Sequence, residues 1–339
     1  MQNISTEKNG FNLHARQVHC NYLQPCHSVP DLVDDVRAGL LSKPRSLPPK
    51  YFYDARGSAL FERITTTPEY YPTRTEDELL AQHATAIIEQ TRPVEIFELG
   101  SGSSRKTRRL FDACNSLDFR CDYAPLDVCK EALIEAATEL NQSYPWLRAN
   151  PVVGDYHAGL GQLPDCSGRR LFLFLGSTIG NFEPEAAAAF MREVHDAMQP
   201  GDYLLLGADR VKKSEILDAA YNDSAGITAD FNLNILNVLN RELDADFALH
   251  QFRHQAHYDS SKQRVEMRLV ASARQSIHLV KLDTTIAMEA GESILTELSH
   301  KFTAAGLEQL ITQAGLVPKQ HIEADDHLFS LLLAEKSAA

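Results

Sequence analysis

Residues 94–104 are Val94-Glu95-Ile96-Phe97-Glu98-Leu99-Gly100-Ser101-Gly102-Ser103-Ser104, an apolar run that ends in a turn of glycine and serine. The apolar run predicts a buried strand, and the residues through Thr107 to Cys114 predict a helix after the turn. Glycine adopts backbone angles that other residues avoid, so backbone N–H groups in such a turn can approach a ligand. The stretch therefore predicts a strand–turn–helix unit with a ligand site, a unit that occurs in many α/β folds.

The succession of strands and helices continues toward the carboxyl end of the chain. Residues 171–175, Leu-Phe-Leu-Phe-Leu, show no alternation of apolar and polar side chains, which is typical of a central parallel strand covered on both faces. Strands that alternate with helices predict an α/β fold with a doubly wound, Rossmann-like sheet. The other elements expected in this part are strands at 119–126, 151–153 and 203–206 and helices at 130–141 and 184–198.

After residue 213 the alternation stops. Residues 214–243 predict helix, and the next segments predict strands at 247–257, 264–271 and 276–282. A helix at 302–314, closed by Gly315 in a left-handed conformation, and strands at 318–322 and 327–335 belong with the first sheet. We therefore expect an α/β domain of residues 75–212 and 302–339, a second α+β domain of residues 20–74 and 213–301, and an N-terminal extension of residues 1–19.

Composition narrows the classes of partner. The chain has 339 residues and a formal net charge of −13, which disfavours a nucleic-acid partner. No stretch approaches the roughly 20 apolar residues of a membrane span, and Met1 to Gly10 lacks the apolar core of a secretory signal. The six cysteines are scattered, which favours reduced thiols and a cytoplasmic location. We also expect a monomer, because no apolar stripe is left over.

The N-terminal part contains one small cluster of potential metal ligands, His19-Cys20 and Cys26-His27. Its spacing does not match a short zinc knuckle, so a coincidental cluster is the preferred interpretation and no metal is expected.

Two features restrict the ligand of the glycine turn. Arg105 stands where a dinucleotide fingerprint would need its third glycine, which argues against pyrophosphate binding. Asp127 ends the second strand, where a carboxylate can hold ribose hydroxyls; it can also cap the next helix, and the two roles are compatible. Asp155 follows the third strand and can accept a hydrogen bond from an adenine amino group, or it is a plain loop residue. Together these features favour S-adenosylmethionine.

Five separated segments, in the same order along most of the chain, resemble the histidine Nα-methyltransferases of ergothioneine biosynthesis, which convert histidine to its trimethylated betaine, hercynine. The resemblance implies a class I methyltransferase sheet, S-adenosylmethionine as methyl donor and L-histidine as substrate. The segments are Leu47-Pro48-Pro49-Lys50-Tyr51-Phe52-Tyr53-Asp54, Pro68-Glu69-Tyr70-Tyr71-Pro72-Thr73-Arg74, the glycine turn, Gly176-Ser177-Thr178-Ile179-Gly180-Asn181 and Thr296-Glu297-Leu298-Ser299.

The resemblance also implies a set of site residues. Tyr53 and Asn181 are the implied catalytic residues, which orient the amine. The implied cofactor-binding residues are Tyr53, Gly100, Ser101, Gly102, Lys106, Asp127, Asp155 and Tyr156. The implied substrate-binding residues are Tyr70, Gly176, Asn181, Tyr221, Met267, Glu297 and Ser299.

Side-chain chemistry agrees with these implied roles. Asn181 and Tyr221 can both donate to a carboxylate, while Glu297 and Ser299, two residues apart on an extended segment, share one face and can hold an imidazole. Without the motif context, structural roles are at least as plausible. These are Tyr53 and Tyr70 as half-buried core residues, Tyr221 as an amphipathic helix residue, Asn181 as a helix cap, Met267 as a core filler and Glu297 as an exposed strand residue.

The expected reaction is direct displacement, in which the neutral α-amine attacks the sulfonium methyl group. A phenol is a poor base at neutral pH, so a proton-accepting role for Tyr53 is disfavoured. The alternatives are an α-amine methyltransferase for another amino acid such as a tryptophan derivative, an NAD-dependent dehydrogenase and a noncatalytic binding protein. A carboxylate at Glu297 disfavours an indole substrate. The missing third glycine disfavours a dehydrogenase, and the combination of cofactor and substrate residues disfavours a noncatalytic binding protein.

Overall fold

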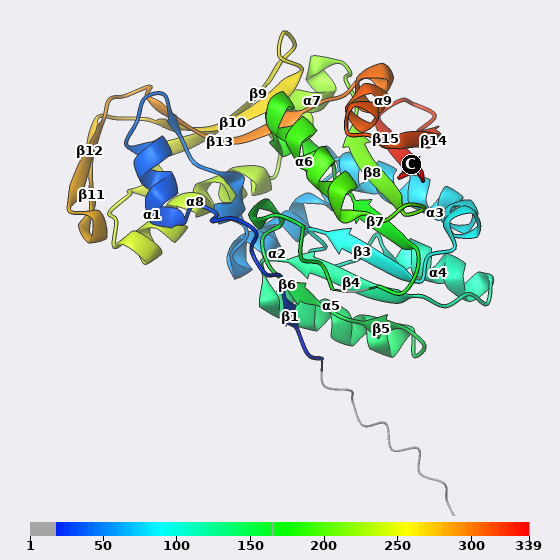
Figure 1. Cartoon of the computed structure of the whole chain (residues 1–339). Helices are drawn as coiled ribbons and strands as arrows, with labels where there is room; N and C mark the ends of the chain where they lie inside the picture. Colours follow the sequence, from blue (N-terminus) through cyan, green and yellow to red (C-terminus); the bar gives the residue numbers. More distant parts are fainter. Residues whose placement is uncertain (1–17, 165, 339) are drawn as a thin grey trace, which may run out of the picture.

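A nine-stranded sheet forms the larger part of the computed structural model, which describes residues 18–164 and 166–338 (Figure 1). Its strands are parallel except β15, which runs antiparallel to both of its neighbours, β8 and β14. The order across the sheet is β1 (Asn21–Tyr22), β6 (Val152–Val153), β4 (Asp122–Asp127), β3 (Glu95–Leu99), β7 (Arg170–Phe174), β8 (Tyr203–Asp209), β15 (Phe329–Glu335) and β14 (Val317–Glu323), with β5 (Arg148–Ala149) beside β4.

Helices cover both faces of this sheet. Side chains of one face, such as Ile96 and Leu171, pack with α3 (Pro72–Thr91) and α4 (Arg108–Ser116). Their strand neighbours Phe97 and Phe172 point to the other face and pack with α6 (Pro184–Ala197) and α9 (Ala304–Gln313). Every residue of β3, β7 and β8 is buried, as the unbroken apolar runs predict. The doubly wound α/β sheet expected from the sequence is confirmed.

A second, four-stranded sheet lies beside the first (Figure 1). Residues from 36–71 and from 217–294 share one apolar core around it, so the N-terminal segment packs with the inserted segment. The strand order is β2 (Arg45–Ser46), β13 (Ser293–His300), β10 (Arg264–Ala271) and β9 (Phe252–Asp259), with β11 (Gln275–Leu279) and β12 (Thr284–Met288) paired as a separate hairpin.

The remaining helices complete the two parts. The longest of them, α8, packs on the second sheet, and α2 packs on α8. These helices are α1 (Leu32–Asp35), α2 (Ala55–Ile64), α5 (Lys130–Ser143), α7 (Ser214–Ala220) and α8 (Ile227–Leu243), with short turns of helix η1 (Val36–Leu40), η2 (Pro49–Phe52), η3 (Tyr156–Ala158), η4 (Thr178–Asn181), η5 (Leu249–Gln251) and η6 (Val280–Leu282).

The structure differs from the sequence expectations in several places. The strand expected over 247–257 begins at Phe252, after η5. The helix expected over 214–243 is two helices, because Gly226 takes a left-handed conformation with φ +72° just before α8. The strand expected over 276–282 ends at Leu279 and gives way to η6. Residues 21–22, expected in the second domain, pair with β6 in the first sheet. This pairing is made by backbone hydrogen bonds, so no side-chain pattern in the sequence indicated it.

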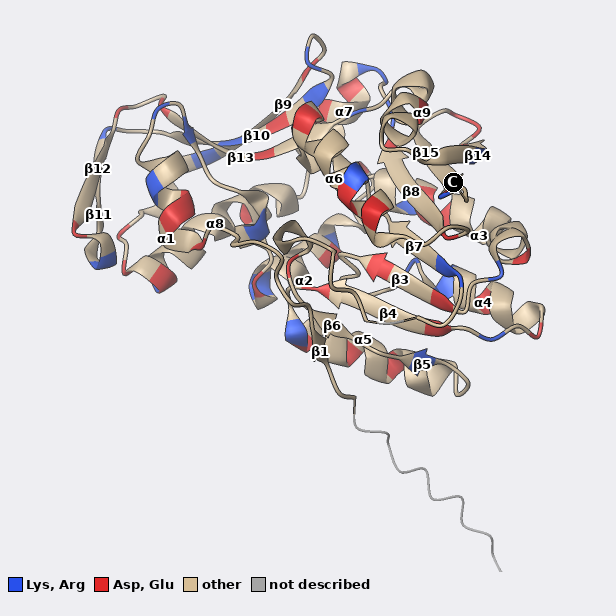
Figure 2. Ribbon diagram, viewed as in Figure 1, with Lys and Arg blue, Asp and Glu red and all other residues tan. Residues whose placement is uncertain are grey.

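Positions of Lys and Arg and of Asp and Glu are interspersed along the ribbon of both parts (Figure 2). Among the helices of residues 18–164 and 166–338, none combines the length and the apolar character needed to cross a membrane.

Candidate active site

The glycine turn lies at the carboxyl end of β3, as expected. Gly100 and Gly102 have φ values of +67° and +49°, which other residues rarely adopt. The N–H groups of Gly100 and Ser101 donate to Leu126 O at 2.8 and 3.1 Å, which ties the turn to β4. The Ser101 hydroxyl oxygen is buried and has no hydrogen-bond partner among the described residues. An unpaired buried hydroxyl in a tight turn is a position at which a bound ligand can supply the missing partner.

Asp127 stands beside this turn. Its Oδ2 accepts from Gly102 N at 2.9 Å, and its Oδ1 accepts from Cys129 N at 2.9 Å just before α5. The same carboxylate therefore fixes the turn and the start of the helix, and the structural role considered from the sequence is present. Each oxygen retains a lone pair for a further donor such as a hydroxyl.

A buried hydrogen-bond network supports the turn from below. The Glu98 carboxylate accepts from Thr107 Oγ1 at 2.6 Å and from the Tyr123 hydroxyl, whose oxygen also lies 2.8 Å from Ser104 Oγ. Burial raises the pKa of Glu98 to about 7, against the opposing effect of these two hydrogen bonds. Glu98 is thus a satisfied internal acid.

Lys106 reaches a residue that the sequence reasoning missed. Its ammonium pairs with Glu76 of α3, a fully buried carboxylate that also accepts from Gly176 N at 2.8 and 3.0 Å. A Cβ on Gly207 would lie 2.0 Å from Glu76 Oε1, so the glycine leaves room for the carboxylate. Glu76 therefore joins the turn after β3 to the turn after β7. Its helix was not expected from the sequence, which left no signal for this residue.

Asp155 and Tyr156 follow β6. Asp155 Oδ1 accepts from His157 N at 2.8 Å and lies 2.7 Å from the His157 ring. Burial acts to raise the pKa of Asp155, but these contacts outweigh it and hold the pKa below its usual value. A Cβ on Gly100 would lie 3.5 Å from the Tyr156 ring, which places that ring beside the glycine turn.

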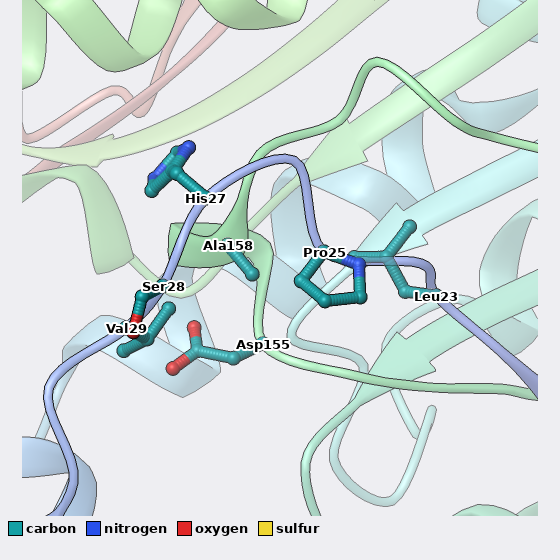
Figure 3. A pocket seen from close by; sticks show the side chains of 7 residues that line it. All are labelled: Leu23, Pro25, His27, Ser28, Val29, Asp155 and Ala158. Carbon is teal, nitrogen blue, oxygen red and sulfur yellow. The ribbon is translucent and has the colours of Figure 1, made fainter.

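An open pocket of about 670 Å³ adjoins Asp155 (Figure 3). The N-terminal segment forms most of its wall, and the Asp155 carboxylate points toward Ser28 and Val29. The lining residues are Leu23, Pro25, His27, Ser28, Val29, Asp155 and Ala158.

The cysteines of the N-terminal cluster are free thiols in the structure, as are the other four. Within residues 18–164 and 166–338, no three His, Cys, Asp or Glu side chains are placed to hold a metal ion.

The other predicted residues gather on the second sheet. Glu297 and Ser299 lie on β13, and Met267 of β10 stands opposite Glu297. The Glu297 carboxylate is half-buried and makes no hydrogen bond to any described residue. Burial raises its pKa to about 7, and Lys301 opposes that rise. A half-buried acid without a partner, unlike Glu98, is available to a ligand.

Ser299 belongs to a buried hydrogen-bond network. Its Oγ lies 2.8 Å from the Tyr221 hydroxyl, and Lys301 Nζ donates to both oxygens at 2.8 Å. Lys301 also pairs with Asp209 Oδ2 at 2.9 Å, at the carboxyl end of β8. The sequence reasoning missed Lys301, although its two-residue spacing from Ser299 could have indicated it. It also missed Asp209, which ends β8 beyond the strand predicted at 203–206.

Tyr53 connects the two groups of residues. Burial raises its pKa well above the ordinary value, and the neighbouring charges of Glu297 and Asp127 add to that effect. Tyr53 therefore lies within electrostatic reach of a predicted substrate residue and of a predicted cofactor residue. Tyr70, whose ring centre is 6.1 Å from that of Tyr221, continues the aromatic wall.

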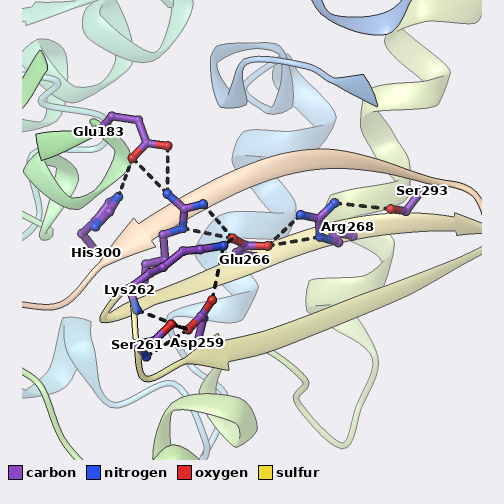
Figure 4. Close-up of polar contacts among 9 residues, drawn as sticks. Glu183, Asp259, Ser261, Lys262, Glu266, Arg268, Ser293 and His300 are labelled. Atoms are coloured by element: carbon purple, nitrogen blue, oxygen red, sulfur yellow. Dashed lines mark hydrogen bonds and ion pairs between the residues drawn. The ribbon is translucent and has the colours of Figure 1, made fainter. Parts of the chain in front are cut away.

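Asn181 ends η4, and this short helix packs directly on β13. A Cβ on Gly180 would lie 2.7 Å from His300 O, so only glycine allows the approach. Glu183 then accepts from Arg264 Nη1 at 2.8 and 2.9 Å, which starts a chain of ion pairs along β10 (Figure 4). The half-buried Asn181 side chain is thereby held close to the strand that carries Ser299.

Comparisons with known proteins cover nearly the whole chain. The family described as histidine-specific methyltransferase, SAM-dependent, matches residues 32–336. The histidine N-alpha-methyltransferase of Mycolicibacterium smegmatis is 46% identical over 296 residues, 87% of this chain and 92% of that protein. The enzyme of the same description from Mycobacterium tuberculosis is 45% identical over 282 residues, 83% of this chain and 88% of that protein.

A more distant relative acts on a different amino acid. The L-tryptophan methyltransferase trpM of Psilocybe serbica is 26% identical over 325 residues, 86% of this chain and 88% of that protein. The similarity therefore includes both sheets and the segments that join them.

Proposed function

Since the chain belongs to the family of histidine-specific, SAM-dependent methyltransferases, we propose that it trimethylates the α-amino group of L-histidine. The product is hercynine, and the reaction is a step of ergothioneine biosynthesis. The state of the Glu297 carboxylate is the observation that supports histidine most strongly. It is a half-buried carboxylate with no hydrogen-bond partner among the described residues, two residues from a serine on the same face. An imidazole N–H can donate the hydrogen bond that this carboxylate does not receive from the described residues.

The residues of the glycine turn fit S-adenosylmethionine. The buried, unpaired Ser101 hydroxyl and the open space around Gly102 leave room and a polar partner for the cofactor. In our proposal Asp127 holds the ribose hydroxyls, Asp155 and Tyr156 contact the adenine, and Lys106 and Tyr53 complete the site with Gly100, Ser101 and Gly102. When bound, S-adenosylmethionine supplies an activated methyl group that the amine takes by displacement.

The residues of the second sheet would orient histidine. Tyr221 and Asn181 donate to its carboxylate, Glu297 and Ser299 bind its ring, Met267 packs on the ring, and Tyr70 and Gly176 close the site. Tyr53 retains its proton at neutral pH, because its pKa lies well above the ordinary value. It therefore does not act as a base, and we propose that its oxygen and that of Asn181 accept from the amine and direct its lone pair.

A tryptophan derivative is the second candidate, suggested by the relative from Psilocybe serbica. An indole has a single N–H donor and no ring nitrogen that can be protonated. Such a ring can donate its N–H to Glu297, but it has no second ring nitrogen to bond Ser299 on the same face of β13. The polar pair on β13 therefore favours histidine.

We also propose that residues 20–74 and 213–301 form the substrate-recognition domain, except for β1, which pairs within the first sheet, and that residues 75–212 and 302–339 form the methyltransferase domain. The shared core of residues 36–71 and 217–294 supports this division. A monomeric, cytoplasmic enzyme remains our expectation.

A methyl-transfer assay against all common amino acids, with mass detection of the products, tests this function. Histidine is expected to give a product heavier by three methyl groups, and the other amino acids to give little or none. Failure to obtain trimethylated histidine would contradict the proposal, and a trimethylated tryptophan would favour the second candidate.

A further inference from the structure

Lys301 lies behind the two hydroxyl groups that we propose as histidine contacts. Its fully buried ammonium donates to Tyr221 Oη and Ser299 Oγ, both at 2.8 Å, and to Asp209 Oδ2 at 2.9 Å. An ammonium has three N–H donors and no acceptor. All three donors are therefore used, and both hydroxyl oxygens are obliged to accept from Lys301.

The two hydroxyl groups then share a fixed number of protons. Tyr221 Oη and Ser299 Oγ lie 2.8 Å apart, so one of them donates to the other. Each hydroxyl has one proton. The pair consequently has one proton left for a ligand, and the residue that donates within the pair offers the ligand only a lone pair.

The proposed substrate decides which residue keeps the free proton. A carboxylate at Tyr221 takes the phenolic proton, because a hydrogen bond to an anion is the stronger one. Ser299 must then donate to Tyr221, and it faces the ring as an acceptor. Glu297, on the same face of β13, is also an acceptor when ionised.

We propose that Lys301, held by Asp209, is a positioning residue that makes Ser299 a hydrogen-bond acceptor, so that the substrate ring is bound with both nitrogens protonated. This inference rests on the proposed function. A neutral ring has one N–H and would leave one of the two acceptors unpaired. The additional proton comes from solvent and forms an N–H bond on the ring nitrogen that faces an acceptor.

Few groups around Glu297 titrate near neutral pH. The groups that face it are Lys301, Tyr53, Tyr70 and Tyr221. Burial raises the pKa of each of these three tyrosines well above the ordinary value, so all three retain their protons. Lys212 pairs with Asp209 in the same cluster, and burial lowers its pKa to about 8. Proton exchange on binding is therefore expected at Glu297, whose pKa is about 7, at Lys212 and at the ring itself.

The test uses hercynine with both ring nitrogens labelled with ¹⁵N, bound to the full-length protein together with S-adenosylhomocysteine. The quaternary amine has no proton to lose, so the ring, Glu297 and Lys212 are the groups that can exchange protons, and the ¹⁵N signals report on the ring alone. At about pH 8 the free ring, with a pKa near 6.5, is mostly neutral. NMR is expected to show two protonated ring nitrogens, and calorimetry in two buffers of different ionisation enthalpy is expected to show uptake of about one proton. A bound ring with one protonated nitrogen and no proton uptake would overturn the proposal.

Two lysine variants separate positioning from charge. Lys301→Met and Lys212→Met each remove one cation from Asp209, but only Lys301 contacts Tyr221 and Ser299. In Lys301→Met the ammonium that holds both hydroxyl oxygens is gone, so Ser299 can turn its proton from Tyr221 to the ring. This variant is therefore expected to leave the bound ring neutral and to weaken hercynine binding about tenfold, the loss expected for one charged hydrogen bond. Lys212→Met is expected to keep the doubly protonated ring. A doubly protonated ring in Lys301→Met would overturn the positioning role.

A third variant tests the proposal in case Lys301→Met does not fold. Ser299→Ala removes the second acceptor without a change of charge, and it too is expected to bind a neutral ring; a doubly protonated ring would contradict the proposal. If the proposed function itself is wrong, the mass-resolved assay gives no trimethylated histidine, whereas failure of this inference alone leaves that product intact.

Discussion

At the base of the glycine turn, Glu98 accepts hydrogen bonds from Thr107 and Tyr123, whereas Glu297 on β13 accepts none from the described residues. Burial raises the pKa of both carboxylic acids to about 7. Burial is the largest cause of the raised pKa in both acids, but among the described residues only Glu98 has hydrogen-bond donors.

The difference separates a structural acid from a binding acid. A buried polar group without a partner is unfavourable, and a fold retains one chiefly where a ligand supplies the partner. Glu98 therefore belongs to the support of the cofactor turn, while Glu297 is available to the substrate. Pairing, and not the pKa, distinguishes the two roles.

Removal of Glu297 gives the largest expected effect. Glu297→Ala should weaken histidine binding about 100-fold at neutral pH, because one charged hydrogen bond in a half-buried site is lost. The affinity for S-adenosylmethionine should stay within about twofold. Calorimetry with each ligand measures both, and Glu297→Gln is the milder variant that keeps the shape. Unchanged histidine affinity would remove Glu297 from the binding site.

Asp127→Ala should affect the cofactor site, which the glycine turn and Glu98 represent in this comparison. S-adenosylmethionine affinity is expected to fall about 10–30-fold, because the ribose contact and the bond to Gly102 are both lost. Asp122→Ala, at the opposite end of the same strand, is the control and should leave that affinity unchanged. A loss confined to histidine binding would contradict the cofactor role.

Titration of Glu98 should contribute to the pH dependence of the free energy of unfolding. A raised pKa means that the folded protein holds this proton more tightly than the unfolded chain, whose glutamate pKa is about 4.3. The contribution to the free energy of unfolding is complete below that value and is lost as the pH rises through about 7. Urea unfolding from about pH 5 to 8 should show a loss of roughly 1–2 kcal/mol that Glu98→Gln lacks. An identical pH profile in the two proteins would show that Glu98 does not titrate in this range.

The ion pair between Arg264 and Glu183 should have the smallest effect. Glu183 is exposed, and exposed pairs contribute about 0–1 kcal/mol. Arg264→Ala is therefore expected to change the histidine KM by about twofold or less, with the change smaller at high salt. A tenfold change would show that this contact controls the position of Asn181.

Sequence reasoning was effective where one local pattern determines the structure. The apolar runs of β3, β7 and β8 and the glycine turn predicted the doubly wound sheet, and the extended segment at Thr296–Ser299 lies within β13. Gly315, expected in a left-handed conformation, has φ +90°. These features depend on periodicity and on the conformational freedom of glycine.

The residues that the sequence did not reveal act across long separations. Glu76 meets Lys106 and Gly176 from a helix with no separate signal, and Asp209 meets Lys301 from another sheet. Such pairs depend on tertiary packing, which no local pattern encodes. The substrate residues themselves came from a family resemblance, and their roles remain predictions.

Carboxyl ¹³C NMR of the glutamates tests the contrast between the two acids most directly. Addition of hercynine and S-adenosylhomocysteine is expected to lower the pKa of Glu297 well below about 7, because a protonated ring becomes its partner, and to leave the pKa of Glu98 unchanged. An unchanged Glu297 pKa, or a shift confined to Glu98, would contradict the account.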